Sequence, residues 1–221
     1  MTSGCERGRS GRLGADQSAR GRARPRRRRS GAPGRLKGLL VLLALAGLTA
    51  GLLLTAKVSR ELRLPLRDES IIRRQAKAKH LDPALIAAVI DAETKFLPRE
   101  SSAGAQGLMQ ILPSTAEFLA KLTGGYAFRT SDLNQPAVNI AYGSWYLRYL
   151  LDHYDGDELA AVAAYNAGMT NVERWRESAR SHGRALTLKD IAFPQTAEYV
   201  RTVLSAEAAY RRLYAKQLGI D

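Results

Sequence analysis

Apolar and polar positions divide the chain into one long apolar run followed by a series of helical segments. Residues 38–56 are 19 consecutive uncharged positions, rich in Leu and Ala. As a helix rising about 1.5 Å per residue, this run is nearly as long as the hydrocarbon core of a bilayer. No side of the run is polar, which favours a membrane-spanning helix over a buried core helix.

Beyond residue 67 the apolar residues recur at helical spacing, and no window of strand length alternates convincingly. Asp68 or Ser70 can cap a helix that continues to about Lys79, and Asp82-Pro83 supplies an N-cap followed by a proline in the first turn of the next helix. The pattern therefore predicts one mainly α-helical domain over residues 68–221.

Later start and stop signals divide this domain further. A capping-box spacing at Ser114 to Glu117 predicts a helix that ends at Leu122, before Gly124-Gly125, and further helices are expected from Pro136, over 159–167, over 172–177 and over about 196–216. Six crowded residues on the helix from Pro136 are expected to form the main aromatic layer of the core: Ile140, Tyr142, Trp145, Tyr146, Tyr149 and Leu150.

The net charge of +13 is concentrated at one end of the chain. Residues 1–37 contain 12 of the 34 basic residues and two of the 21 acidic ones, a net charge of +10, so the rest of the chain carries only +3. This arm has almost no large apolar residues and is predicted to be disordered. It also lacks interleaved aromatic residues that could stack on bases, so nucleic-acid binding is not indicated.

A basic arm before an apolar run predicts a membrane topology. The positive-inside rule keeps residues 1–37 in the cytoplasm and places the domain, after a short linker at 57–67, on the other side of the membrane. A cleavable signal peptide is the alternative, because Ala44-Leu45-Ala46 and Leu54-Thr55-Ala56 could serve as cleavage sites.

Glu93 is the candidate catalytic residue. On a helix it lies on the same face as Ile86, Val89 and Ile90, which precede it by seven, four and three residues. An apolar environment disfavours the charged form of a carboxyl and raises its pKa toward the range that suits a general acid near neutral pH. The alternative is a structural Glu at the wet edge of an amphipathic helix.

The residues after Glu93 provide a binding wall. Residues 101–107 are rich in small side chains, so the backbone can pack closely beneath a cleft, and Leu108, Met109 and Gln110 then offer apolar surface together with one amide. Such an amide can donate and accept hydrogen bonds, which suits an acetamido sugar.

Four ordered blocks resemble the soluble-lytic-transglycosylase (SLT) family, whose catalytic domain is similar to goose-type lysozyme. The blocks are Glu93-Thr94, Gly107-Leu108-Met109-Gln110, Ala164-Tyr165-Asn166-Ala167-Gly168 and Tyr199-Val200, and the resemblance covers about residues 71–214. Two positions depart from the family pattern. Thr94 replaces the usual Ser and keeps the hydroxyl, whereas Gln195 replaces a common acid and removes a possible second carboxylate.

The resemblance implies a lysozyme-like helical domain that cleaves the β-1,4 bond between N-acetylmuramic acid and N-acetylglucosamine in peptidoglycan glycan strands. The product would be a 1,6-anhydro-muramoyl end, with Glu93 acting first as acid and then as base. By the same resemblance, Tyr165 and Tyr199 would orient the carboxylate and the acetamido group. The other substrate-binding residues would be Thr94, Met109, Gln110, Tyr146 and Asn166.

No cofactor or metal site is expected, since His80, His153 and His182 are scattered and have no metal-binding spacing. The expected location is the inner membrane of a bacterium, with a single membrane pass and the domain on the extracytoplasmic side. Partners beyond glycan strands and the membrane, including other cell-wall enzymes, are left open. Two alternatives to the transglycosylase remain: a muramidase that hydrolyses the same bond, and a non-catalytic wall-binding domain.

Overall fold

A computed structural model of the chain describes residues 42–52, 64–124 and 128–220. The chain divides into two compact units, residues 1–49 and 50–221. Residues 42–52 are helical, but among the described residues no helix is long and apolar enough to cross a membrane. The rest of the apolar run, the basic arm and the linker up to residue 63 lie outside the described residues.

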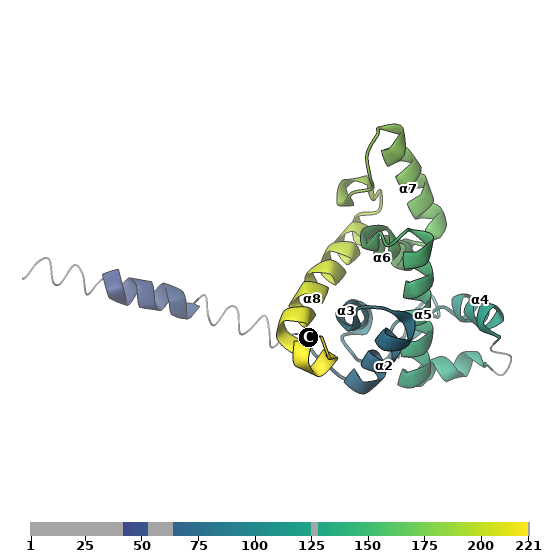
Figure 1. The fold of residues 1–221 in the computed structure, drawn as a ribbon, viewed down its shortest axis with the longest axis horizontal. Coiled ribbons are helices and arrows are strands. Elements are labelled where there is room, and N and C mark those ends of the chain that lie inside the picture. Colours follow the sequence, from purple (N-terminus) through teal and green to yellow (C-terminus); the bar gives the residue numbers. More distant parts are fainter. Residues whose placement is uncertain (1–41, 53–63, 125–127, 221) are drawn as a thin grey trace, which may run out of the picture. The chain divides into compact units, whose positions relative to one another are not determined.

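The second unit is mainly helical, as the sequence predicts (Figure 1). Its helices are α2 (Glu69–Lys79), α3 (Pro83–Thr94), α4 (Pro113–Thr123), α5 (Pro136–His153), α6 (Glu158–Ala167), α7 (Met169–Ser181) and α8 (Pro194–Leu218), with short 3-10 helices at Thr130–Asn134 and Leu188–Asp190. The strands β1 (Arg99–Glu100) and β2 (Gln106–Gly107), of two residues each, pair as an antiparallel hairpin that the sequence did not indicate.

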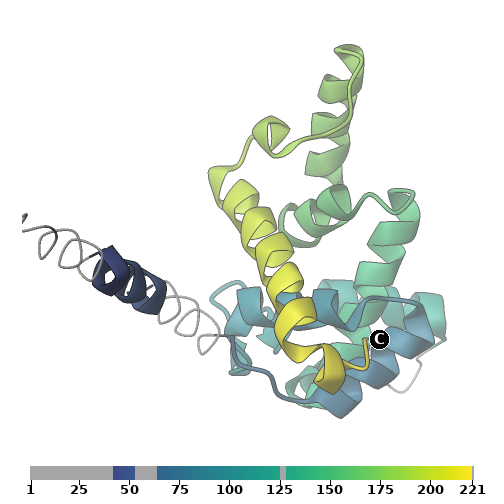
Figure 2. The ribbon, with the colours of Figure 1, turned by 60° about the vertical axis from the view of Figure 1, so that its left-hand side comes forward.

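Helix α3 lies at the centre of the domain. Every residue from Ala84 to Asp91 is buried, because the helix packs against α2 on one side and along α8 on the other. Figure 2 shows α8 descending from the α7 connection until its C-terminal end lies beside α2. The helix that carries Glu93 is therefore a core helix and not an amphipathic surface helix.

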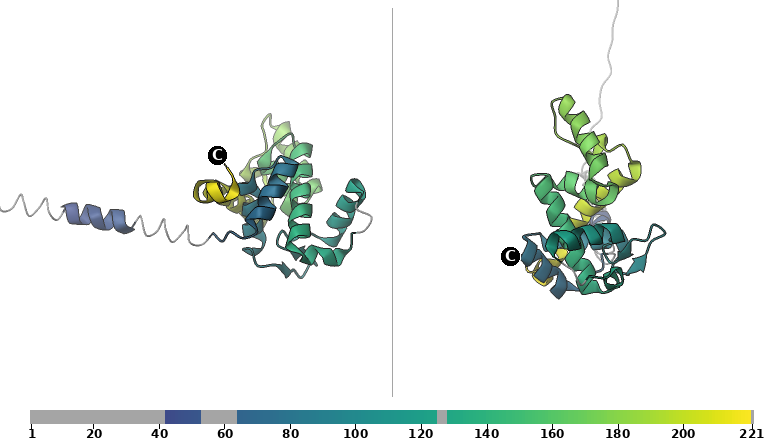
Figure 3. Two further views of the ribbon diagram at one scale, coloured as in Figure 1. Left: turned by 60° about the horizontal axis from the view of Figure 1, so that its bottom comes forward. Right: turned by 90° about the vertical axis from the view of Figure 1, so that its right-hand side faces the viewer.

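Helix α5 forms the second layer, in contact with α2 and α6. Two views place α4 and α8 on opposite sides of α5 (Figures 1 and 3). The prediction that aromatic residues of this helix form the main aromatic layer of the core is wrong. Ile140 and Leu150 are fully buried, but the four aromatic residues between them are only partly buried, and the core consists chiefly of Ala, Leu, Ile and Val side chains.

The helix boundaries follow the capping signals with three exceptions. Asp68 is at the N-cap position of α2, but its side chain makes no capping bond, and Ser70 lies inside the helix. Asp82 caps α3 as predicted, since its carboxylate accepts a hydrogen bond of 2.6 Å from the Ala84 N–H. The capping box at Ser114 is wrong, because Pro113 already occupies the first turn and the N-cap is Leu112, which makes no side-chain capping bond. Helix α7 is also longer at both ends than the predicted segment 172–177.

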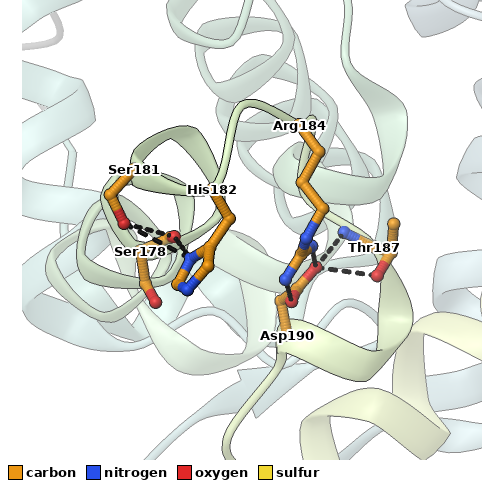
Figure 4. Close-up of polar contacts among 6 residues, drawn as sticks. All are labelled: Ser178, Ser181, His182, Arg184, Thr187 and Asp190. Carbon is orange, nitrogen blue, oxygen red and sulfur yellow. Dashed lines mark hydrogen bonds and ion pairs between the residues drawn. The ribbon is translucent and has the colours of Figure 1, made fainter.

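The polar connection between α7 and α8 is held by its own side chains (Figure 4). The Arg184 guanidinium donates two hydrogen bonds, of 2.5 and 2.6 Å, to the Asp190 carboxylate. The same carboxylate accepts hydrogen bonds from the backbone N–H and the hydroxyl of Thr187. This bidentate pair fixes the length of the connection that brings the chain to the start of α8.

Gly107, at the end of the hairpin, lies where no side chain fits. Its φ is +76°, and a Cβ built there would lie 2.1 Å from Asn139 Nδ2 and 2.5 Å from the Leu133 carbonyl oxygen. Gly104, in the same hairpin, has a φ of +78° but no neighbour within 4 Å of its Cβ position. Both glycines have a positive φ, but only Gly107 has neighbouring atoms close to the position that a Cβ would occupy.

This difference predicts unequal costs for the two alanine substitutions. We expect Gly107→Ala to lower the free energy of unfolding by about 3 kcal/mol, because a left-handed residue and an overpacked contact add together. Gly104→Ala should cost only about 1 kcal/mol, from its backbone conformation. Urea unfolding of both variants measures the difference, and equal costs would show that the contact at Gly107 yields without strain.

Candidate active site

Glu93 lies in the last turn of α3, at an abrupt change of chain direction. Lys95 and Phe96, which follow, have φ values of 54° and 59°, a left-handed conformation that non-glycine residues adopt only at a cost. Burial of Phe96 and an ion pair of 2.7 Å between Lys95 and Asp91 stabilise the turn. The Arg99 guanidinium donates a hydrogen bond of 2.6 Å to the Glu93 carbonyl oxygen, which closes the helix end.

The carboxyl of Glu93 is half-buried and contacts a phenol from the last helix. The Tyr199 hydroxyl donates a hydrogen bond of 2.7 Å to Glu93 Oε1. Burial raises the pKa of Glu93, while the Tyr199 hydrogen bond and the positive charge of Arg99 offset part of that increase. Burial is the larger effect, so the proton is retained to higher pH than on a solvated glutamate.

A second carboxylate does not face Glu93 within the part of the chain that the structure describes. Tyr199 and Arg99 are the groups that shift its pKa, besides burial, and no acid is among them. Asp91 is buried and paired with Lys95, and Glu100 is exposed on β1. Nor do three potential metal ligands cluster anywhere in these residues.

Asn139 of α5 holds the wall that follows the hairpin. Its Oδ1 accepts a hydrogen bond of 2.7 Å from the Met109 N–H, and its Nδ2 donates to the carbonyls of Gln106 and Leu133. The side chain is completely buried. Because all three bonds go to backbone groups, one amide fixes the position of the whole turn that leads to Gln110.

Gln110 and Tyr165 are partly buried and form hydrogen bonds to that turn. Gln110 is left-handed, with a φ of 49°, and its amide donates to the carbonyls of Arg99 and Gly107. The Tyr165 hydroxyl donates a hydrogen bond of 2.8 Å to the Met109 carbonyl oxygen. Burial and the nearby Glu93 raise the pKa of the Tyr165 phenol, so the wall and the acid lie close together.

Two adjoining pockets extend along this wall. One, of about 290 Å³, is lined by residues of the turn, of α6 and of α5, including Gln110, Tyr146, Tyr165 and Asn166. The other, of about 270 Å³, is lined by residues of α4 and α5 and by Met169. Thr115 and Tyr146 line both, so the pockets form one groove.

Four of the eight residues expected from the sequence line this groove, namely Gln110, Tyr146, Tyr165 and Asn166, whereas Glu93 and Tyr199 are not among its lining residues. The Tyr146 and Tyr165 rings lie 5.4 Å apart, and Asn166 accepts a hydrogen bond of 2.8 Å from the Thr196 hydroxyl. Thr94 and Met109 are instead buried. The Thr94 hydroxyl donates to the Leu108 carbonyl oxygen at 2.7 Å. Their placement favours support of the wall over direct contact with a ligand.

Sequence reasoning did not identify Arg99 or Thr115 as part of the site, and it named Asn139 only as a match to the family pattern, without a role. Asn139 could have been recognised as an amide on the otherwise apolar face of a helix, a position that requires buried partners. Arg99 and Thr115 gave no signal, since each is an ordinary polar residue in a polar stretch. Only the turn after α3 brings Arg99 back to Glu93.

Comparison with known proteins gives consistent matches over this part of the chain. The family model of the transglycosylase SLT domain matches residues 70–187. A soluble lytic murein transglycosylase of Salmonella typhimurium is 31% identical over 160 residues, which cover 71% of this chain and 25% of that protein. A membrane-bound lytic murein transglycosylase C of Actinobacillus pleuropneumoniae is 35% identical over 109 residues, covering 44% of this chain and 30% of that protein.

Among solved structures, an inactive glutamate-to-glutamine mutant of the lytic transglycosylase Slt from Pseudomonas aeruginosa matches with a TM-score of 0.64 and 32% identity. The match covers 70% of this chain and 26% of that one. The chain thus spans about a quarter of the length of the soluble relatives that it matches.

The geometry around Glu93 predicts how its pKa responds to a neighbouring substitution. Tyr199→Phe removes a hydrogen bond that lowers the pKa of Glu93, so we expect the pKa to rise further and the protonated form to persist to higher pH. Carbon-13 NMR of the glutamate carboxyls measures this value. Tyr214→Phe, on the same helix but bonded to the Leu64 carbonyl, is the control and should leave the pKa unchanged. A lower pKa in Tyr199→Phe would contradict the assigned contact.

Proposed function

The chain belongs to the family of the transglycosylase SLT domain, and from this premise we propose that it is a peptidoglycan lytic transglycosylase with a mainly helical, lysozyme-like catalytic domain. The observation that carries the proposal is the half-buried carboxyl of Glu93, bonded to Tyr199 and without a facing acid among the described residues. The named activity of the relatives and the inactive glutamate-to-glutamine mutant of one of them support it.

The proposed reaction uses Glu93 twice. As an acid, Glu93 protonates the glycosidic oxygen while the bond from that oxygen to the anomeric carbon of N-acetylmuramic acid breaks, and the substrate's own acetamido group shields the anomeric carbon. As a carboxylate, it then removes the proton of the C6 hydroxyl, whose oxygen forms the new bond to the anomeric carbon. The acid is regenerated, a 1,6-anhydro end is formed and no water is consumed.

The absence of a facing carboxylate among the described residues favours this route over hydrolysis with two acids. Glycosidases that use an acid pair place the second carboxyl across the scissile bond, as nucleophile or as base for a water. Here Tyr199 and Tyr165 surround Glu93 instead. Phenols with raised pKa values stay neutral and can orient a carboxylate without competing for the reaction centre.

The wall residues have proposed roles in holding the glycan. Gln110 and Asn166 present amides to the groove, which suit the acetamido groups of the sugars. The partly buried Tyr146 ring offers an apolar face to a sugar. Thr94 and Met109 would contribute indirectly, because their hydrogen bonds fix the backbone that carries Gln110.

Replacement of the acid tests the reaction directly. We expect Glu93→Gln to lower the release of soluble products from purified sacculi by at least about 100-fold, because the proton donor is lost. Glu100→Gln, which alters an exposed acid on the neighbouring strand, is the matched control and should retain activity. Mass spectrometry of the wild-type products should find ends that are one water lighter than reducing ends.

Two results would replace this proposal with an alternative. Reducing ends in place of anhydro ends would identify a hydrolytic muramidase. Unchanged activity in Glu93→Gln would leave a non-catalytic wall-binding domain as the function of this fold.

We further propose that the protein is anchored in the inner membrane of a bacterium by one helix over residues 38–56, with the domain outside the cytoplasm. The uncharged run, the preceding basic arm and the membrane-bound relative support this proposal. Peptidoglycan lies on that side of the membrane, so the topology and the proposed substrate agree.

Extraction of the full-length protein tests the anchor. We expect it to remain with membranes in high salt, to require detergent for release and to keep the intact mass of all 221 residues. The fragment from Lys57 to Asp221 should be released without detergent. A mass that corresponds to cleavage after Ala46 or Ala56 would establish a signal peptide in place of the anchor.

A further inference from the structure

The flank of the domain between α2 and α5 contains a second hollow, separate from the groove lined by Gln110, Tyr146 and Tyr165. A pocket of about 570 Å³ is lined by the C-terminal end of α2 and by Trp145, Arg148 and Asp152 of α5. A smaller one, of about 190 Å³, adjoins it, and Lys79 and Trp145 line both. None of these residues lines the groove.

Lys79 is the unusual residue in this hollow. Its ammonium is partly buried and donates a hydrogen bond to the neutral side chain of Gln75. Burial lowers the pKa of Lys79, and among the described residues no carboxylate lies beside the ammonium to offset this effect. Lys77, two residues earlier on the same helix, is exposed. It already places a positive charge near the C-terminal end of the helix, so interaction with the helix dipole does not explain why Lys79 is partly buried.

Arg148 adds a second unsatisfied donor. One of its terminal nitrogens pairs with Asp152 at 2.7 Å, and the other donates to the His80 carbonyl oxygen at 3.2 Å. Its Nε is buried and has no hydrogen-bond partner within the part of the chain described. A buried donor without a partner costs free energy.

Trp145 supplies the apolar surface between the two pockets. Its ring is partly buried and stacks on Tyr149 at 5.8 Å between centroids, with Leu119, Ala141 and Tyr142 completing the smaller pocket. The hollow therefore combines an aromatic surface with the Lys79 ammonium and with an Arg148–Asp152 ion pair. Lys79 is the cation in it that no carboxylate pairs with among the described residues, so the hollow fits an organic anion with an apolar body, and a carboxylate would form a charge-assisted hydrogen bond with the ammonium.

We propose that Lys79, Trp145 and Arg148 form a second binding site, outside the catalytic groove, for a carboxylate of a peptidoglycan peptide stem. The choice of ligand rests on the proposed function, since peptide stems are the carboxylate-bearing groups attached to the glycan strand. A strand held in the groove by its sugars would be held on this flank by a stem, so peptide-bearing strands bind in preference to bare ones.

The experiment uses the full-length protein in detergent, with nitrogen-15-labelled tryptophan. The chain has two tryptophans, and Trp175, packed edge-on against Phe193, is the internal control. The probe is the free tetrapeptide L-Ala-γ-D-Glu-meso-diaminopimelyl-D-Ala. We expect it to shift the indole signal of Trp145 and to leave that of Trp175 in place, and calorimetry gives the affinity.

Matched variants separate the lysine from a general effect of charge. Lys79→Met keeps the length of the side chain and should weaken tetrapeptide binding at least tenfold. Lys79→Arg should bind within a few-fold of wild type, as should Lys77→Met on the exposed side of α2. Thermal unfolding of each variant shows whether the fold is intact, and the response of the Trp145 signal in the wild-type protein decides the question even if Lys79→Met unfolds.

Several outcomes would overturn the proposal. These are an unmoved Trp145 signal, equal affinity in wild type and Lys79→Met, or equal losses in Lys79→Met and Lys77→Met. Displacement of the tetrapeptide by uncharged chitotetraose would place it in the groove, and tighter binding of free N-acetylmuramic acid would make the sugar acid the ligand. Glu93→Gln should bind the tetrapeptide normally, so a failure of the proposed catalysis and a failure of this site are distinguishable.

Discussion

The hydrogen bond between Tyr199 and Glu93 joins residues 106 positions apart, and the candidate site depends on it. It forms only because α8 packs along α3, whose residues are buried almost throughout. The same packing removes water from one side of the carboxyl, which raises its pKa, while the phenol keeps the carboxyl oriented. The packing of α8 on α3 thus determines both the position and the pKa of the Glu93 carboxyl.

The wall opposite the acid depends on close backbone approach. Gly107 leaves room for the Asn139 amide, and Gly143 leaves room for Met109, whose sulfur would lie 2.4 Å from a Cβ at that position. Asn139 then bonds three backbone groups, and Tyr165 bonds the Met109 carbonyl from the other side. The position of Gln110 therefore depends on two glycines, which allow close packing, and on the hydrogen bonds of Asn139 and Tyr165.

Much of this could be predicted from the sequence, because local signals coincide with the fold. Asp82-Pro83, Pro136 and Gly168 mark helix ends through their own backbone chemistry. The acid was found from its apolar neighbours and from the resemblance of the surrounding blocks. The burial of Thr94 was not predictable, because its hydroxyl is satisfied by Leu108, 14 positions away.

Contacts of this kind depend on the turn after α3, which two left-handed non-glycine residues form against their usual preference. No local pattern indicates such a turn, so neither the hairpin nor the return of Arg99 to Glu93 could be foreseen. The aromatic residues of α5 failed as core predictions for a related reason. Their number suggested a core layer, but the core is filled by α3 and α6, whose small and aliphatic residues pack more closely.

Gln195 lies exposed in the first turn of α8, one turn before Tyr199. An acid at this exposed position would be solvated. The neighbouring Thr196 is buried, and its hydroxyl donates a hydrogen bond to Asn166 that links α8 to α6. Glu93 is thus held by burial and by Tyr199 of α8, with no facing acid among the described residues, and the neutral side chain at position 195 is compatible with that arrangement.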